Sequence, residues 1–224
     1  MIYKTLPIEQ QKLLDLHLTL VLEENKISNL TRITDEGQGL LLHVEDSLQG
    51  LPEVNDAPDG VLVDLGTGGG FPGIPLSIVT ERITLLVDSV GKKTKALDRI
   101  INALGINDKT STFTGRAEEL ALQQPSFASV ITARALSSMP SLLELASPLL
   151  MEGGRLVCYK GQDNEKELEH AKALEDKLGM RLVSHRSFKL ADQVTNRSIF
   201  SFEKTHEPKV KLPRRPGMAQ KRPY

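Results

Sequence analysis

A glycine-rich segment that joins an apolar strand to a helix constrains the fold of this chain most strongly. The segment, Asp64–Gly73, overlaps the end of the short apolar run Val61–Leu65 and precedes the helical pattern Ile74–Val79. Glycine lets the backbone turn sharply and approach a ligand closely, and such sites lie at the carboxyl ends of strands. The segment therefore predicts a site for a nucleotide-like cofactor at one edge of a sheet.

Strands and helices alternate through most of the chain. The expected strands are residues 61–65, 83–88, 110–114, 128–132, 155–159, 181–186 and 198–202, and the expected helices are 74–79, 92–104, 138–150 and 165–178. Strands that are apolar throughout and alternate with helices indicate a parallel sheet covered on both faces. We therefore expect an α/β, Rossmann-like fold with a doubly wound, mostly parallel sheet of seven strands.

Three regions are expected along the chain. Residues 8–25 carry apolar side chains at helical spacing, residues 40–48 show a second short helical pattern, and residues 52–60 are expected to form a loop. We expect residues 1–60 to form a helical extension packed on the core, residues 61–204 to form the cofactor-binding core, and residues 205–224 to form a flexible tail.

Composition excludes several classes of protein. The 224 residues are 39% hydrophobic and 25% charged, and Cys158 is the only cysteine, so an internal disulfide is impossible. The sequence shows neither the apolar core of a signal peptide nor a run of about 20 apolar residues that could cross a bilayer. We therefore expect a cytoplasmic protein with no membrane association.

The net charge of −1 conceals an uneven distribution. Residues 204–224 contain seven Lys or Arg and one acid, which leaves 21 basic and 28 acidic residues in the rest of the chain. Four prolines in this segment favour an extended rather than a helical conformation. A basic tail on an acidic body suggests a polyanionic partner, although a solvated, disordered end explains the charge equally well.

Three details of the glycine-rich segment favour S-adenosylmethionine (SAM) over NAD. Phe71 occupies the position where dinucleotide-binding loops need a third small residue. Asp64, at the strand's end, can pair with the ammonium of a methionyl group but would repel a pyrophosphate. Asp88 ends the next strand, where a carboxylate can accept hydrogen bonds from both ribose hydroxyls. The alternative for each aspartate is a helix cap.

Two further motifs fall at the same expected edge. Ala117 and Glu118 follow the third strand, where a backbone amide and a carboxylate could recognise adenine, but acids in the first turn of a helix explain them as well. Arg134 follows the fourth strand, and a surface ion pair is its alternative role. These residues alone leave both motifs undecided.

His43 is the one histidine that we connect with function. The other four fall on patterns typical of solvated surfaces: His17, His170, His185 and His206. Cys158 lies in an apolar strand and is interpreted as a buried core thiol rather than a nucleophile.

Eight segments of the sequence resemble the bacterial ribosomal small-subunit methyltransferase G family, also called glucose-inhibited division protein B. They are Asn29–Asp35, His43–Leu48, Asp64–Pro75, Leu86–Lys93, Gly115–Glu119, Thr132–Ala135, Tyr159–Gly161 and Pro213–Pro223. The match runs from about residue 10 to the end of the sequence in the family's order. Glu24 and Glu45 depart from the family, which usually has an aromatic and an apolar residue there, and the N-terminal helical region is shorter than usual.

The resemblance implies a class I SAM-dependent methyltransferase that modifies N7 of one guanosine in 16S rRNA and releases S-adenosylhomocysteine (SAH). It implies that the cofactor contacts Gly66, Phe71, Ala117, Glu118 and Arg134, and with Asp64, Gly68 and Asp88 these are the expected cofactor-binding residues. We expect a guanine pocket shaped by Asn29, Thr31, Arg32, His43, Asp46 and Ser47. We expect RNA contacts from Lys92, Lys93, Lys160, Arg214, Arg215, Lys221 and Arg222.

Guanine N7 carries a lone pair and no proton, so its methylation needs no general base, and no residue is assigned as catalytic acid or base. We expect no metal and a monomer that acts on 16S rRNA or the small ribosomal subunit. Deletion of residues 209–224 is expected to weaken RNA binding and leave SAM affinity unchanged. A small-molecule methyltransferase, a non-catalytic RNA-binding factor and an NAD oxidoreductase are the competing hypotheses.

Overall fold

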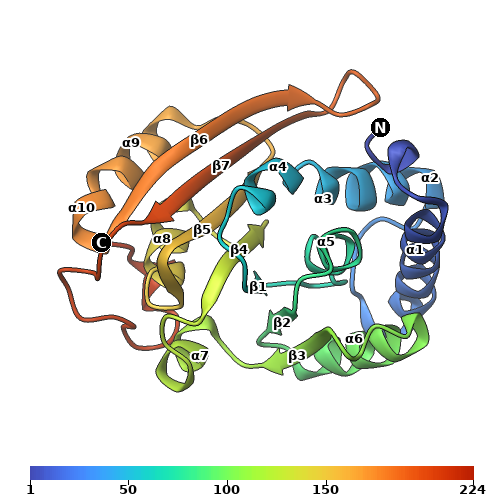
Figure 1. Ribbon diagram of the computed structural model, residues 1–224, viewed down its shortest axis with the longest axis horizontal. Coiled ribbons are helices and arrows are strands. Elements are labelled where there is room, and N and C mark those ends of the chain that lie inside the picture. The colour runs from blue at the N-terminus through green and yellow to red at the C-terminus, as the bar shows by residue number, and fades with distance from the viewer.

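The computed structural model describes residues 1–224, and its centre is one sheet of seven strands in the order β3-β2-β1-β4-β5-β7-β6 (Figure 1). The strands are β1 (Val61–Leu65), β2 (Thr84–Asp88), β3 (Thr110–Thr114), β4 (Ala128–Arg134), β5 (Leu150–Lys160), β6 (Met180–Lys189) and β7 (Asn196–Lys204). Strands β1 to β5 run parallel, whereas β7 is antiparallel to both β5 and β6. The predicted α/β fold and mostly parallel sheet are confirmed.

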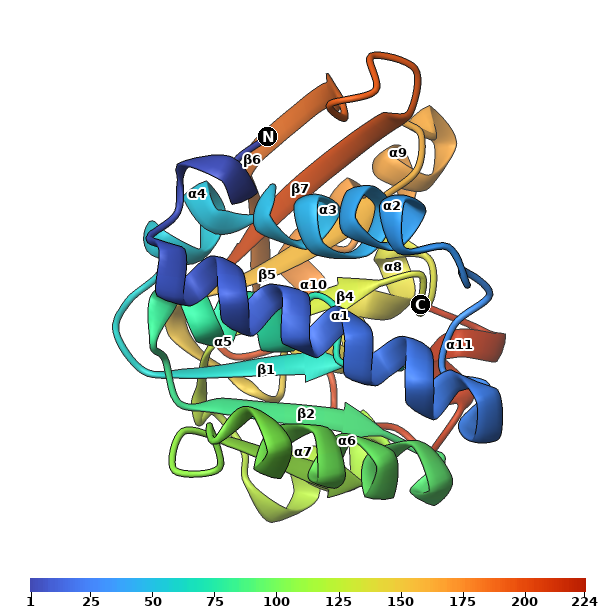
Figure 2. The same cartoon turned by 90° about the vertical axis from the view of Figure 1, so that its right-hand side faces the viewer.

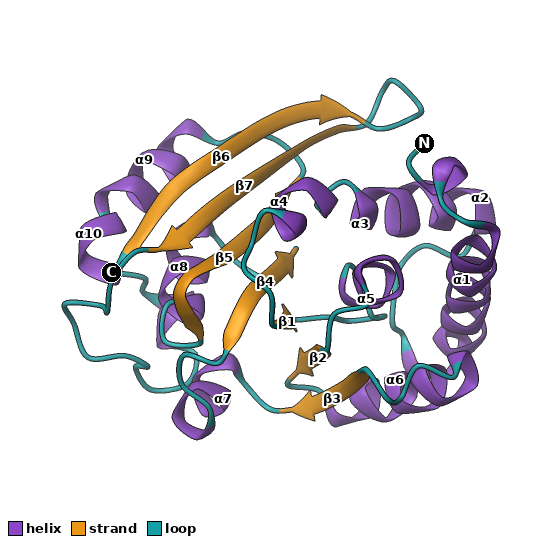
Figure 3. Cartoon of the chain, viewed as in Figure 1, coloured by secondary structure: helices purple, strands orange, loops and turns teal.

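Helices cover both faces of the sheet (Figure 3). They are α1 (Ile8–Ser28), α2 (Glu36–Gly39), α3 (Asp46–Leu48), α4 (Leu51–Asn55), α5 (Gly73–Thr80), α6 (Gly91–Leu104), α7 (Ala117–Gln123), α8 (Met139–Ala146), α9 (Glu165–Ala173), α10 (Glu175–Leu178) and α11 (Met218–Lys221). One apolar cluster joins α7, α8 and α11 to the sheet, and another joins α1, α5 and α6 on the opposite face. None of the helices combines the length and apolarity that a bilayer crossing requires.

Parallel pairing aligns the carboxyl ends of the strands at one edge. Leu65 of β1 lies opposite Val87 of β2 and Ala133 of β4, while Asp88 lies opposite Thr114. The loops that follow β1, β2, β3 and β4 therefore leave the sheet side by side. This register brings motifs from widely separated parts of the chain to one place.

The N-terminal region packs against α5 and α6. Leu14, Leu18 and Val21 of α1 are buried in the same cluster as Ile74 and Leu97. Figure 2 shows α1 lying across α5. The helical spacing in the sequence thus corresponds to a face that contacts the core.

The second N-terminal helical pattern contains a π-helical segment, η2 (Leu40–Glu45), between α2 and α3. Such wide turns are rare and are often found at functional sites. Glu45, at its end, is 1% exposed, and its carboxylate accepts hydrogen bonds from the amides of Ile2 (2.8 Å) and Tyr3 (3.0 Å). The unusual acid at position 45 therefore fixes the first residues of the chain.

The acid at position 24 also has a defined partner. Both carboxylate oxygens of Glu24 accept hydrogen bonds from the Arg99 guanidinium, at 2.8 and 2.7 Å. Because Arg99 belongs to α6, this pair joins α1 to the core. The two departures from the family at positions 24 and 45 are thus polar attachments of the N-terminal region.

Two segments expected to be irregular contain helices. The expected loop 52–60 begins inside the helix α4, because Pro52 falls in the first turn, where its missing amide donor costs no hydrogen bond. Segment 205–224, expected to be extended and flexible, includes α11 and packs on the body, with Ala219 only 2% exposed. Its apolar and ionic partners lie far away in the sequence, so local composition could not reveal them.

Candidate functional site

The candidate site lies at the carboxyl ends of β1, β2, β3 and β4 and comprises two cavities separated by the glycine-rich loop. Gly66 and Ala135 line both cavities. Gly66 and Gly68 have φ values of +70° and +58°, in the left-handed region that favours glycine. The loop therefore adopts a backbone path that places main-chain atoms, rather than side chains, between the cavities.

Asp64 lies beneath the loop and lines neither cavity. Its side chain is fully buried, accepting hydrogen bonds from the Gly73 amide (3.0 Å) and the Thr132 hydroxyl (2.8 Å). Burial raises the pKa of this carboxyl to about 6, although hydrogen bonds from these neighbours oppose the rise. The structure thus places Asp64 where it holds the loop to β4, and its expected contact with a methionyl ammonium remains a prediction.

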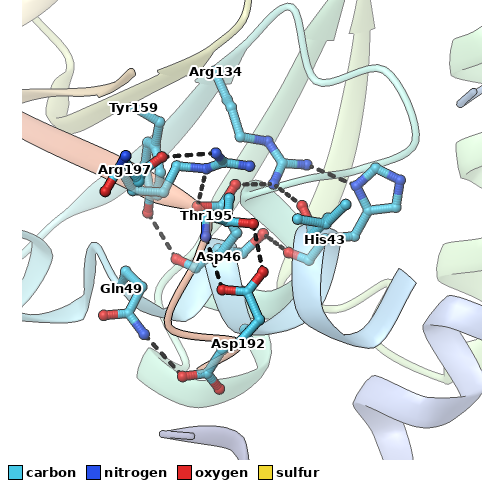
Figure 4. A network of polar contacts seen from close by, with 12 residues as sticks. His43, Asp46, Gln49, Arg134, Tyr159, Asp192, Thr195 and Arg197 are labelled. Atoms are coloured by element: carbon cyan, nitrogen blue, oxygen red, sulfur yellow. Dashed lines mark hydrogen bonds and ion pairs between the residues drawn. The ribbon is translucent and has the colours of Figure 1, made fainter. Parts of the chain in front are cut away.

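The first cavity has a volume of about 550 Å³ and is lined by Thr31, His43, Asp46, Gly66, Gly68, Phe71 and Arg134, all of which the sequence singled out. Asp46 is its central acid. One carboxylate oxygen accepts from Arg134 (3.1 Å) and the other from Arg197 of β7 (3.0 Å), as Figure 4 shows. The Asp46 side chain is 4% exposed, so this carboxylate is a buried bridge between two guanidinium groups.

His43 is held in one tautomer by its neighbours. Its Nδ1 faces an amino group of Arg134 at 3.3 Å, and its Nε2 lies 2.7 Å from the Thr31 hydroxyl oxygen. Arginine can only donate, so Nδ1 accepts and Nε2 carries the proton that it donates to Thr31. Burial and the nearby Arg134 charge lower the pKa of His43 to about 4, which makes the ring neutral at pH 7.

Phe71 lies between two histidine rings. His43 stacks on it at a centroid distance of 4.6 Å, and His17 approaches at 4.4 Å. His17, expected on a solvated surface, is fully buried, and its Nε2 lies 3.0 Å from the carbonyl oxygen of Gly69. Burial lowers the pKa of His17 to about 3. The expectation for His17 is wrong: it supports the loop from below.

The second cavity, of about 300 Å³, is lined by Asp88, Ala117 and Glu118. Each Asp88 oxygen accepts one backbone hydrogen bond, from Gly68 (3.2 Å) and from Val90 (2.9 Å). Glu118 is 6% exposed and accepts through Oε1 alone, from the Gly217 amide at 2.7 Å. Because a carboxylate has about four acceptor positions, both acids retain free ones at this cavity.

The remaining substrate-pocket candidates lie outside the first cavity. Asn29 ends α1 in a left-handed conformation and lines a shallow groove beside that helix. Arg32 is exposed. Ser47 is fully buried, and its hydroxyl donates to the carbonyl oxygen of His43 at 2.5 Å. The structure therefore brings together only Thr31, His43 and Asp46 of the six.

Four of the seven expected RNA-binding cations are engaged within the protein. Lys92 donates to the Ile27 carbonyl, Lys93 lies 3.8 Å from Asp88, Lys160 pairs with Glu167 at 2.6 Å, and Arg214 pairs with Glu144 at 2.5 Å. The other three, Arg215, Lys221 and Arg222, are exposed. The interpretation of Lys160 and Arg214 as freely available phosphate ligands does not fit this geometry.

Several residues that line the cavities had not been predicted, and three of them carry polar side chains that bear on the chemistry. Arg197 and Tyr159 line the first cavity, and Gln220 lines the second. Tyr159 donates its hydroxyl proton to the Ser47 carbonyl at 2.7 Å and is buried. Tyr159 sits at the end of the fifth strand, a position that could have identified it, whereas Arg197 and Gln220 carry no local signal. No three His, Cys, Asp or Glu side chains gather as they would around a metal ion.

The sequence also matches known proteins along almost its whole length. Residues 10–200 match the family described as GidB, rRNA small subunit methyltransferase G. The chain is 35% identical to the ribosomal RNA small subunit methyltransferase G of Carboxydothermus hydrogenoformans, covering 97% of this chain and 94% of the relative. It is also 35% identical to that of Lactobacillus johnsonii, covering 96% and 92%.

Solved structures show the same fold at low sequence identity. An O-methyltransferase from Bacillus cereus in complex with SAH superposes with a TM-score of 0.59 at 18% identity, covering 84% of this chain and 90% of that one. A tRNA methyltransferase from Bacillus subtilis gives a TM-score of 0.57 at 14% identity, covering 75% and 67%.

Proposed function

Since this chain belongs to the ribosomal RNA small subunit methyltransferase G family, we propose that it transfers a methyl group from SAM to N7 of a guanosine in 16S rRNA. The observation that carries the proposal is the pair of cavities that share Gly66 and Ala135 as lining residues. The second cavity offers carboxylates to a nucleoside, and the first offers a wall in which a buried carboxylate lies between two guanidinium groups. A cofactor and a base can therefore meet at the glycine-rich loop.

The residues of the second cavity suit SAM. Asp88 has a free acceptor position on each oxygen, which matches the two hydroxyls of a ribose. Glu118 keeps Oε2 free for the amino group of adenine, while the Ala117 amide lies at the start of α7. SAM supplies a sulfonium methyl group, an electrophile that a neutral nitrogen lone pair can attack. In this arrangement Asp88, Ala117 and Glu118 bind the adenosyl part and leave the loop beside Gly66 to face the methionyl part.

The first cavity suits a neutral purine. His43 is neutral, and both its nitrogens are engaged, so it cannot accept a proton from a substrate. That fits guanine N7, which has no proton to remove. Thr31 accepts from His43 and from the Ile33 amide (3.1 Å), so its own hydroxyl proton is free for an acceptor such as guanine O6. The planar guanidinium of Arg134, 5.6 Å from the centroid of the Phe71 ring, provides a flat group beside which a base can lie.

Alignment is then the main contribution of the protein to the rate. Holding two reactants in line contributes up to about 7–11 kcal/mol in well-oriented systems. The buried bridge from Arg134 through Asp46 to Arg197 fixes the side chains around the base. Arg215, Lys221 and Arg222 remain exposed cations that can contact RNA phosphates, and such contacts set register without reading sequence.

The direct test is transfer of a tritiated methyl group from SAM to naked 16S rRNA and to assembled small subunits, with an RNA-free control. We expect incorporation into at least one RNA substrate, recovered after nuclease digestion as 7-methylguanosine. Incorporation at another base would contradict the proposed product. No incorporation into either substrate, by protein that binds SAH, would contradict the enzymatic role itself.

A further inference from the structure

Segment 205–224 is attached to the body beside the second cavity. Helix α11 lies against α8 (Figure 2), and Arg214 makes a two-pronged ion pair with Glu144, whose side chain is 3% exposed. The ring of Tyr224 is contacted by the guanidinium of Arg214 at 4.2 Å and by the ammonium of Lys177 at 3.9 Å. A buried charge pair and an aromatic anchor thus hold this segment in place.

Segment 205–224 also donates a hydrogen bond to Glu118, one of the two acids of the second cavity. The Gly217 amide donates to Glu118 Oε1 at 2.7 Å, and Glu118 has no cationic partner. Gly217 has a φ of +81°, a conformation that favours glycine, and a Cβ there would meet no atom closer than 3.8 Å. Any other residue would therefore strain the backbone without a steric clash. The direction of this one amide depends on glycine.

Gln220, three residues further on, lines the second cavity together with Asp88 and Glu118. Its amide can both donate and accept hydrogen bonds. Adenine presents ring-nitrogen acceptors beside its amino group, so the free oxygen of Glu118 and the amide of Gln220 match the two kinds of group on its edge. A basic RNA-binding tail would not need either feature.

We propose that residues 213–222 form a wall of the cofactor site, in which Gln220 contacts the adenine edge and Gly217 orients Glu118 toward the adenine amino group. This inference rests on the proposed function, because the ligand is the adenosyl group of SAM. It reverses the expectation from the sequence that removal of residues 209–224 leaves SAM affinity unchanged. Deletion of the segment is now expected to lower that affinity.

The test uses point variants of the full chain, because deletion would also expose the buried side that Ala219 covers. SAH affinity is measured by titration calorimetry for wild type, Gln220→Ala and Gly217→Ala. Loss of one hydrogen bond predicts roughly two- to tenfold weaker binding for each variant. Gln123→Ala removes an exposed glutamine of α7 that lines neither cavity of the site, and this variant is expected to bind SAH as wild type does.

A second ligand separates recognition of adenine from general loosening of the site. S-inosylhomocysteine carries an oxygen where SAH carries the adenine amino group, so it presents an acceptor to Glu118. Wild type is expected to prefer SAH, and Gly217→Ala and Gln220→Ala are expected to reduce that preference. Wild-type affinity and preference in both variants would overturn the inference while leaving the proposed function intact. Failure of the wild type itself to bind SAH would contradict the proposed function instead.

Discussion

The two cavities differ in how far their polar groups are already satisfied. In the first, Asp46 uses both oxygens on guanidinium groups, and His43 uses both ring nitrogens. In the second, Asp88 and Glu118 keep free acceptor positions, and their only close partners are backbone amides and Lys93. The polar groups of the first cavity are therefore already paired with one another and define its shape. The acids of the second cavity keep acceptor positions that a bound ligand can use. Substitutions in the first should act mainly on stability, and those in the second mainly on affinity.

The largest effect is expected from Asp46→Ala. This change removes the acid that lies between Arg134 and Arg197 and leaves two largely buried cations without compensation, which costs about 3–5 kcal/mol of unfolding free energy. Urea unfolding would measure it. The matched control is Glu24→Ala, which breaks the pair with the 57% exposed Arg99 and should cost less than about 1 kcal/mol. Equal losses in the two variants would contradict the idea of a buried bridge.

A pH-dependent effect is expected from His17. Its pKa is about 3 in the folded protein and near its ordinary value of 6.5 in the unfolded chain, so below pH 6.5 the unfolded state binds the extra proton. This group's stabilising contribution is complete above pH 6.5 and falls by about 1.4 kcal/mol for each pH unit below it. The test is to measure the free energy of unfolding of wild type and of His17→Gln between pH 4 and 7. The titration of His43 contributes to both proteins and cancels in the difference between them. Parallel stability curves would contradict the buried, neutral state of His17.

Asp88→Asn is expected to cause a smaller free-energy change, which appears in the affinity for SAH. The amide keeps one acceptor for a backbone N–H but loses the charge offered to ribose hydroxyls, so SAH binding should weaken about tenfold or more. Calorimetric titration would measure it, with Asp98→Asn, an exposed acid of α6, as the matched control. If Asp88→Asn bound SAH as tightly as wild type does, the claim that the acids of the second cavity act mainly on ligand affinity would be contradicted.

The parts of this molecule that local pattern determines could be predicted from the sequence. Strands β1 and β3 have the predicted bounds, and parallel order alone places Asp88, Ala117 and Arg134 at one edge. His17 was predictable in principle, because it lies three residues after Leu14 and four before Val21, on the buried face of α1. Because histidine has only an intermediate tendency to be buried, residue type and helical spacing give opposite indications at this position.

The remainder depends on partners that local pattern does not reveal. Arg197 meets Asp46 across 151 positions, and Gly217 meets Glu118 across 99. The composition of segment 205–224 shows only that it is basic and rich in proline. Its contacts depend on the conformation of Gly217 and on Glu144, a buried acid of α8. Asp64 illustrates the opposite case: the sequence located it correctly at the end of β1, but only packing shows that its side chain faces the loop's own backbone.

The bridge between Asp46 and Arg197 also has a consequence for biosynthesis. A ribosome delivers the π-helical segment and the glycine-rich loop long before it delivers β7, and the loop-closure entropy of such distant contacts must be overcome before they stabilise anything. Until β7 docks, Asp46 faces Arg134 alone, and the wall of the first cavity is incomplete. A nascent chain stalled before β7 would therefore hold the residues of the glycine-rich loop without an assembled site. Assembly of the first cavity therefore waits for β7, because Asp46 is the residue that joins Arg134 to Arg197.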